Sequence, residues 1–115
     1  MIVVDASALL EALLRPPPPP ALASRIYDPL ETLHAPHLLD VEVTQVIRRY
    51  TLSRQISNQR GLEAVDDLLR LPLHRHPHNL LLPRIWQLRN NVTAYDAVYI
   101  ALAESLGAPL FFITV

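Results

Sequence analysis

Apolar and polar residues alternate along this chain in a pattern that predicts short strands separated by helices. The β-branched run Met1–Val4 ends at Asp5 and predicts a buried strand. Further short apolar runs predict strands at Thr32–Ala35, Leu73–His76 and Leu110–Val115. Because helical segments lie between these strands, the pattern predicts an α/β fold with a parallel sheet covered on both faces and right-handed crossovers.

The segments between the strands carry helical spacing or helix boundary signals. Ser7 is the expected N-cap of the first helix, and Gly107 is the expected end of the last one. Five consecutive prolines, residues 16–20, predict a stiff polyproline II loop, with an SH3-type ligand as the alternative. The predicted helices are Ala8–Leu14, Ala21–Leu30, Leu38–Leu52, Ser57–Leu71, Leu80–Leu88 and Thr93–Leu106.

Two of these helices have clear amphipathic faces. In Leu38–Leu52 the expected inward stripe is Leu39, Val43, Val46, Ile47 and Tyr50. In Ser57–Leu71 the expected inward residues are Leu62, Val65, Leu68 and Leu69. Most of the remaining acids, including Asp40, are expected to face solvent.

The length and composition of the chain are those of a single globular domain. The 115 residues fit a single domain, 1–115, and half of them are apolar, which is enough to build a core. There is no cysteine, which excludes disulfides and thiolate chemistry. No apolar run is long enough to span a bilayer and the start is a poor signal peptide, so we expect a cytoplasmic protein without membrane contact.

Three carboxylates occupy positions where apolar residues are expected. Asp5 ends the first strand, and ligands of open α/β sheets bind at the carboxyl ends of strands. Glu42 lies on or beside the buried stripe of its helix, and Asp96 lies within the almost wholly apolar stretch Ala94–Ala103. Because buried carboxylates repel one another, a divalent cation would stabilise them, and oxygen ligands suit Mg²⁺ or Mn²⁺.

Each acid also has a purely structural explanation. Asp5 could cap the following helix, Glu42 could pair with Arg48 or Arg49, and Asp96 could favour a helix start because of the macrodipole. Ser7 could support Asp5 by a hydrogen bond. Thr93 and Tyr95 flank Asp96 and could line the same site.

Histidine and arginine add two weaker signals. His74, His76 and His78 alternate as residues on one face of a strand do, which permits a metal site, although surface histidines are usually just solvated. Net charge is −1, yet all ten basic residues are arginine, whose planar fork suits phosphate. The candidate phosphate contacts are Arg15, Arg48, Arg49 and Arg54.

Three segments carry a resemblance to a known family. They read MIVVDASALLEALL from Met1, APHLLDVEVTQVIRR from Ala35, and TAYDAVYIALAESLGAPL from Thr93. In this order and spacing the chain resembles a PIN-domain protein, specifically a VapC-type toxin of a type II toxin–antitoxin module. The region between Ile56 and Leu88 matches only in general character.

The resemblance implies a three-layer PIN fold and Mg²⁺-dependent endoribonuclease activity that leaves a 5′-phosphate. It also implies inhibition by a VapB-like antitoxin and assembly as a homodimer. The family's first three acids fall on Asp5, Glu42 and Asp96, which would be both catalytic and metal-binding, with Mg²⁺ as the cofactor.

The end of the chain departs from the family pattern. Family members usually continue with a stretch like L-L-T-x-D, whose aspartate is a fourth site acid, then a further helix and strand. Here no acid follows Glu104, so the resemblance implies a C-terminally shortened domain, less stable than its full-length relatives, with at best weak nuclease activity. The alternative is a catalytically impaired remnant that acts only through antitoxin binding.

Overall fold

The fold is a parallel sheet with helices on both faces, as the alternation of strands and helices predicts. The structure is a computed structural model, and it describes residues 1–15 and 20–112. Four of the five prolines at 16–20 and the last three residues of the expected strand Leu110–Val115 lie outside the described residues. Within them, no helix is long and apolar enough to cross a membrane.

All four strands of the sheet run parallel, in the order β3-β2-β1-β4. The central strand β1 is fully buried, which suits its unbroken β-branched sequence. β2 begins one residue later than expected, and of the three described residues of the expected last strand, Leu110 and Phe111 pair as β4. The strands are β1 (Ile2–Val4), β2 (Leu33–Pro36), β3 (Leu73–His76) and β4 (Leu110–Phe111).

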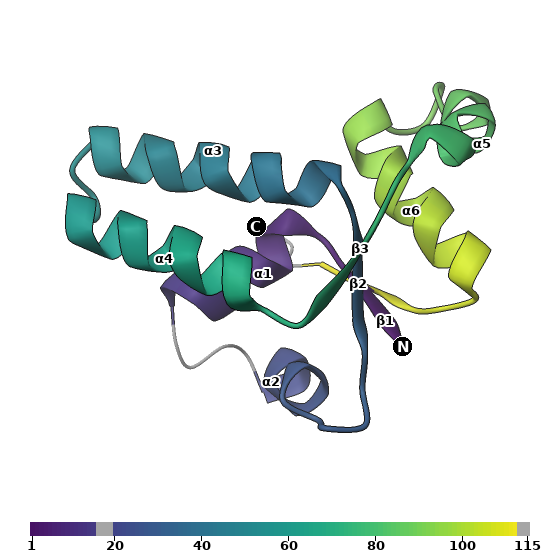
Figure 1. Cartoon of the computed structure of the whole chain (residues 1–115). Coiled ribbons are helices and arrows are strands. Elements are labelled where there is room, and N and C mark those ends of the chain that lie inside the picture. The colour runs from purple at the N-terminus through teal and green to yellow at the C-terminus, as the bar shows by residue number, and fades with distance from the viewer. Residues whose placement is uncertain (16–19, 113–115) are drawn as a thin grey trace.

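Helices cover both faces of this sheet (Figure 1). α1, α3 and α4 lie on one side of the strands, and α5 and α6 lie on the other. A single 3₁₀ turn, Asn79–Leu81, leads into α5. The helices are α1 (Ala6–Leu14), α2 (Pro20–Ile26), α3 (Leu38–Leu52), α4 (Asn58–Arg70), α5 (Leu82–Gln87) and α6 (Ala94–Leu106).

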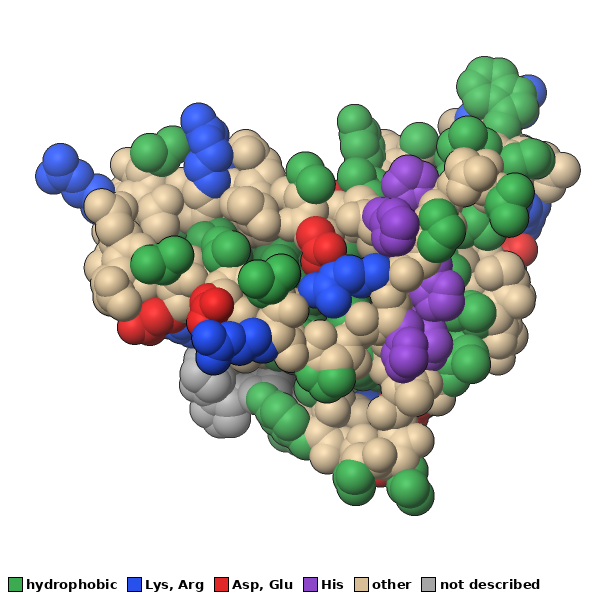
Figure 2. Space-filling model, in the orientation of Figure 1, with side chains coloured by type: hydrophobic (Ala, Val, Ile, Leu, Met, Phe, Trp, Pro, Cys, Tyr) green, Lys and Arg blue, Asp and Glu red, His purple; other side chains and the backbone are tan. Residues whose placement is uncertain are grey.

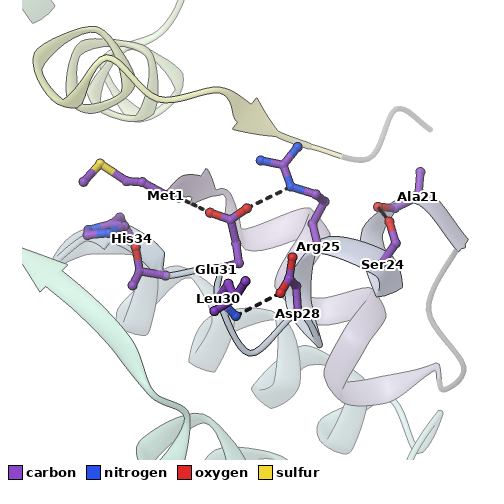
Figure 3. A network of polar contacts seen from close by, with 9 residues as sticks. Met1, Ala21, Ser24, Arg25, Asp28, Leu30, Glu31 and His34 are labelled. Carbon is purple, nitrogen blue, oxygen red and sulfur yellow. Dashed lines mark hydrogen bonds and ion pairs between the residues drawn. The ribbon is translucent and has the colours of Figure 1, made fainter.

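The connection from α2 to β2 differs from the prediction. α2 was expected to reach Leu30 but ends at Ile26. Pro29 disfavours helical geometry at Asp28, whose carboxylate instead accepts a hydrogen bond from the Leu30 amide at 2.9 Å. Glu31 then pairs with Arg25 at 3.0 Å and with the amino terminus (Figure 3). These contacts fix the start of β1 against the loop that enters β2.

α3 and α4 pack more closely than their apolar pattern indicates. Leu39, Val43 and Ile47 face inward as expected, and Ser57 caps α4. In α4, however, the buried face is formed by Gly61, Ala64 and Leu68. The expectation that Leu62 and Leu69 point inward is wrong, because they are 65% and 76% exposed.

One ion pair joins three elements beside this helix pair. Arg75 on β3 donates to the Asp40 carboxylate at 2.8 Å and to the carbonyl of Leu68, near the end of α4, also at 2.8 Å. Asp40 was expected to be solvated, but it is only half-exposed and its Oδ1 is buried without a hydrogen-bond partner. Arg75 therefore holds the start of α3, the end of α4 and the edge strand together.

Candidate active site

The three candidate acids come from three separate segments of the chain. Asp5 directly follows β1, Glu42 lies in the second turn of α3, and Asp96 lies in the first turn of α6. The charge of Asp96 raises the pKa of both Asp5 and Glu42, and the charge of Asp5 also raises the pKa of Glu42. The fold therefore brings these carboxylates close enough for their negative charges to repel one another.

Asp5 has both a capping role and a place in this acidic group. Its Oδ1 accepts a hydrogen bond from the Ala8 amide at 3.0 Å, so Asp5 is the N-cap of α1. The expectation that Ser7 is the cap is therefore wrong. Ser7 instead donates from Oγ to Asp5 Oδ1 at 2.7 Å, which is the supporting contact expected of it. Burial, the largest cause, and the charge of Asp96 together raise the pKa of Asp5, although these hydrogen bonds act to lower it.

Glu42 is held by a residue that the sequence did not single out. The hydroxyl of Tyr99 donates a hydrogen bond to Glu42 Oε1. Burial is the largest cause of the raised pKa of Glu42, and the Tyr99 hydrogen bond acts against it. Among the described residues neither Arg48 nor Arg49 forms an ion pair with Glu42. Tyr99 lies three residues after Asp96 in α6, but Glu42 lies on another helix, so this spacing does not point to their contact.

Asp96 differs from the other two acids because its side chain is exposed. The expectation of a carboxylate on the buried stripe is wrong for Asp96. Thr93 is the N-cap of α6, and its hydroxyl accepts from the Asp96 amide at 3.2 Å. Asp96 therefore lies at the positive end of the helix dipole, which stabilises its charge, while its side chain stays open to solvent.

The donor chemistry of this group fits a hard divalent cation. Carboxylate oxygens are the ligands that Mg²⁺ and Mn²⁺ prefer, and burial together with neighbouring carboxylates raises the pKa values of Asp5 and Glu42. Within residues 1–15 and 20–112, however, no three acidic, histidine or cysteine side chains form a ready-made metal cluster.

A groove extends from this acidic group along α3. Its floor and walls are mainly apolar, and three polar side chains, Gln45, Arg49 and Tyr95, line it beside Glu42. The apolar lining is provided by Ala6, Leu38, Val41 and Val46. The surface is hollowed between the α3–α4 side of the molecule and the α5–α6 side (Figure 2).

The histidines gather on one face of the β2–β3 edge (Figure 2). His34 Nδ1 lies 2.8 Å from His76 Nε2, and the rings of His34 and His74 stack at 4.8 Å. Like every other group of such side chains in the described part of the chain, the candidate set His74, His76 and His78 does not form a three-ligand metal site. The buried partner, His34, was missed because it lies on a different strand.

Comparison with known proteins agrees with the fold. Residues 2–114 match the PIN domain family. Ribonuclease VapC12 of Mycobacterium tuberculosis is 44% identical over 96% of this chain and 84% of its own length. Ribonuclease VapC1 of the same species is 44% identical over 94% of this chain and 81% of its length. This chain therefore belongs to the PIN-domain family, and within that family it is of the VapC type.

A solved structure supports the architecture. The crystal structure of M. tuberculosis VapC20, a toxin that cleaves the sarcin-ricin loop, superposes with a TM-score of 0.69 at 15% identity. The match covers 99% of this chain and 90% of that protein. At this identity the likeness concerns the fold, and it confirms the expected three-layer α/β arrangement around a parallel sheet.

Proposed function

We propose that this chain is an endoribonuclease toxin that hydrolyses RNA phosphodiester bonds with the help of Mg²⁺ or Mn²⁺. The observation that carries the proposal is the electrostatic repulsion among Asp5, Glu42 and Asp96, which lie close together near the end of β1. The relatives of similar length that are named ribonucleases support the reaction type. A bound divalent ion would lower the pKa of a water ligand and neutralise charge that develops on the phosphate.

Each residue then has a defined task. Asp5 and Asp96 would hold the ion directly, and Glu42 would hold it or orient a water molecule. Ser7 fixes the Asp5 carboxylate through its 2.7 Å hydrogen bond, and Tyr99 fixes Glu42 in the same way. Thr93 caps α6 and so sets the position from which Asp96 projects.

RNA would enter as an unpaired segment, since single-stranded loops expose the backbone and the bases to a protein surface. The protein would be neutralised by a VapB-like antitoxin and would form a homodimer in the cytoplasm, as VapC-type proteins are expected to do. Size-exclusion chromatography with light scattering tests the homodimer, and titration of the nuclease with a purified antitoxin tests the inhibition.

The decisive experiment is a cleavage assay on mixed RNA with Mg²⁺, Mn²⁺, Ca²⁺ or EDTA. We expect cleavage with Mg²⁺ or Mn²⁺, none with EDTA, and at least about 100-fold less with Asp96→Asn, because a bound ion supplies several kcal/mol of transition-state stabilisation. Cleavage that survives EDTA or Asp96→Asn would contradict the proposal. A protein that binds antitoxin but cuts no RNA would instead be the impaired remnant.

A further inference from the structure

The groove beside Glu42 combines an aromatic ring, a guanidinium and an apolar wall at one end of the acidic group. Tyr95 immediately precedes Asp96, and its side chain is 64% exposed. Arg49 lies at the far end of the groove, and Gln45 lies between Arg49 and Glu42 on the same helix. None of these three side chains has a part in holding the carboxylates.

Arg49 lines the groove with a positive charge. Its side chain is exposed, and none of the ion pairs within the described part of the chain contains its guanidinium. Arg49 follows Glu42 by seven residues, which is two helical turns, so both face the groove about 10 Å apart along the axis. That separation is too long for both to contact one phosphate, so Arg49 suits the phosphate of a neighbouring nucleotide.

Tyr95 gives the groove a flat surface for a base. Exposed aromatic rings bind single-stranded nucleic acid by stacking, and every base has a face that can stack. The apolar walls opposite, including Leu38 and Val41, would cover the other face of the base. The amide of Gln45 offers both a donor and an acceptor to a base edge.

We propose that this groove is the subsite for an unpaired nucleotide next to the scissile bond, with its base on Tyr95 and a flanking phosphate on Arg49. The proposal rests on the proposed nuclease function and adds the residues that select single-stranded RNA. The guanidinium favours an anionic ligand over an apolar peptide, so RNA is the occupant rather than a protein segment.

Binding without cleavage tests the subsite separately from the chemistry. A fluorescein-labelled, mixed-sequence 12-mer RNA is titrated in EDTA, with the same RNA annealed to its complement for comparison. The variants are Tyr95→Leu, Tyr95→Trp and Arg49→Gln. Two matched controls are Tyr27→Leu, which removes an equally exposed tyrosine, and Arg70→Gln, which removes an exposed arginine of α4.

We expect the single strand to bind more tightly than the duplex. Tyr95→Leu should weaken RNA binding at least about fivefold, and Tyr95→Trp should retain it. Arg49→Gln should lower the slope of log affinity against log salt concentration by about one, which corresponds to one lost phosphate contact. Both controls should bind as the unmodified protein does. In the Mg²⁺ cleavage assay Tyr95→Leu should raise KM and leave kcat nearly unchanged.

Unchanged RNA affinity in Tyr95→Leu and Arg49→Gln, with normal cleavage, would overturn the subsite and leave the nuclease proposal standing. A loss confined to antitoxin binding would overturn it in favour of a protein-docking groove. If the unmodified chain cuts no RNA but binds it, and Tyr95→Leu weakens that binding, the nuclease proposal fails while the nucleotide-binding groove is supported.

Discussion

His34 Nδ1 lies 2.8 Å from His76 Nε2, which joins the buried strand β2 to the edge strand β3. The other ring nitrogen of His34 lies 2.9 Å from the Thr32 hydroxyl. Two imidazoles can share one such hydrogen bond only if at least one of them is neutral. The histidines therefore make the pairing of the edge strand sensitive to acid.

The first prediction is a loss of stability between pH 7.5 and 5.5. Burial, His74 and His76 lower the pKa of His34 below its ordinary 6.5, so the unfolded chain takes up protons first as the pH falls. The stability that neutral His34 contributes is present above pH 6.5 and is lost below it. Urea denaturation at both pH values should show a smaller change for His34→Gln than for the unmodified protein, while the exposed His37→Gln should follow the unmodified protein.

The second prediction concerns Glu42→Gln. Burial and the charges of Asp96 and Asp5 raise the pKa of Glu42, so its ionisation opposes folding at neutral pH. The amide still accepts the Tyr99 hydrogen bond, and the metal-free variant should melt at a higher temperature at pH 7. This difference should vanish below about pH 4.5, where the carboxyl is protonated in both states. A lower melting temperature at pH 7 would contradict the like-charge argument.

Tyr99→Phe provides the third prediction. The change leaves the half-buried Glu42 carboxylate without its hydroxyl donor, which should cost about 1–3 kcal/mol of unfolding free energy. Because that hydrogen bond lowers the pKa of Glu42, the acid limb of the cleavage profile should move to higher pH. The matched change Tyr95→Phe, at an exposed ring, should leave both the stability and the acid limb unchanged.

The fourth prediction is that Arg75 and Asp40 are strongly coupled. Arg75→Met should cost about 1–3 kcal/mol, because it removes the partner of a carboxylate whose second oxygen is already buried without one. The double variant with Asp40→Leu should lose less than the sum of the single changes. The exposed pair Arg70 and Asp66 is the control, and its cycle should give under about 1 kcal/mol.

The last prediction concerns the close approach of α4 to α3. An alanine Cβ at Gly61 would collide with Cγ2 of Thr51, so Gly61→Ala should destabilise by about 1–3 kcal/mol despite the better helix propensity of alanine. Thr51→Ser removes that methyl group and should rescue much of the loss. In contrast, Gly107→Ala meets no atom within 4 Å, and its cost of about 1 kcal/mol should come from the positive φ and be insensitive to Thr51→Ser.

The amino-acid sequence alone determined the order of strands and helices, because hydrophobic periodicity and cap residues are local properties. α3 occurs at its predicted bounds, and Thr93 and Gly107 delimit α6 as expected. The acids Asp5, Glu42 and Asp96 were also identified locally, since carboxylates on apolar elements are unusual wherever the chain folds. Their role in metal binding and catalysis stays a prediction.

Only the tertiary structure decided what these residues touch. Tyr99 became the partner of Glu42 because the fold brings its hydroxyl, on α6, within hydrogen-bond reach of α3, and no spacing along one helix reports a contact between two helices. Leu62 and Leu69 were misplaced for the same reason, since Gly61 lets the helices approach on a different face. The pairing of His34 with His76 likewise follows from strand register, which is set by the packing of the whole sheet.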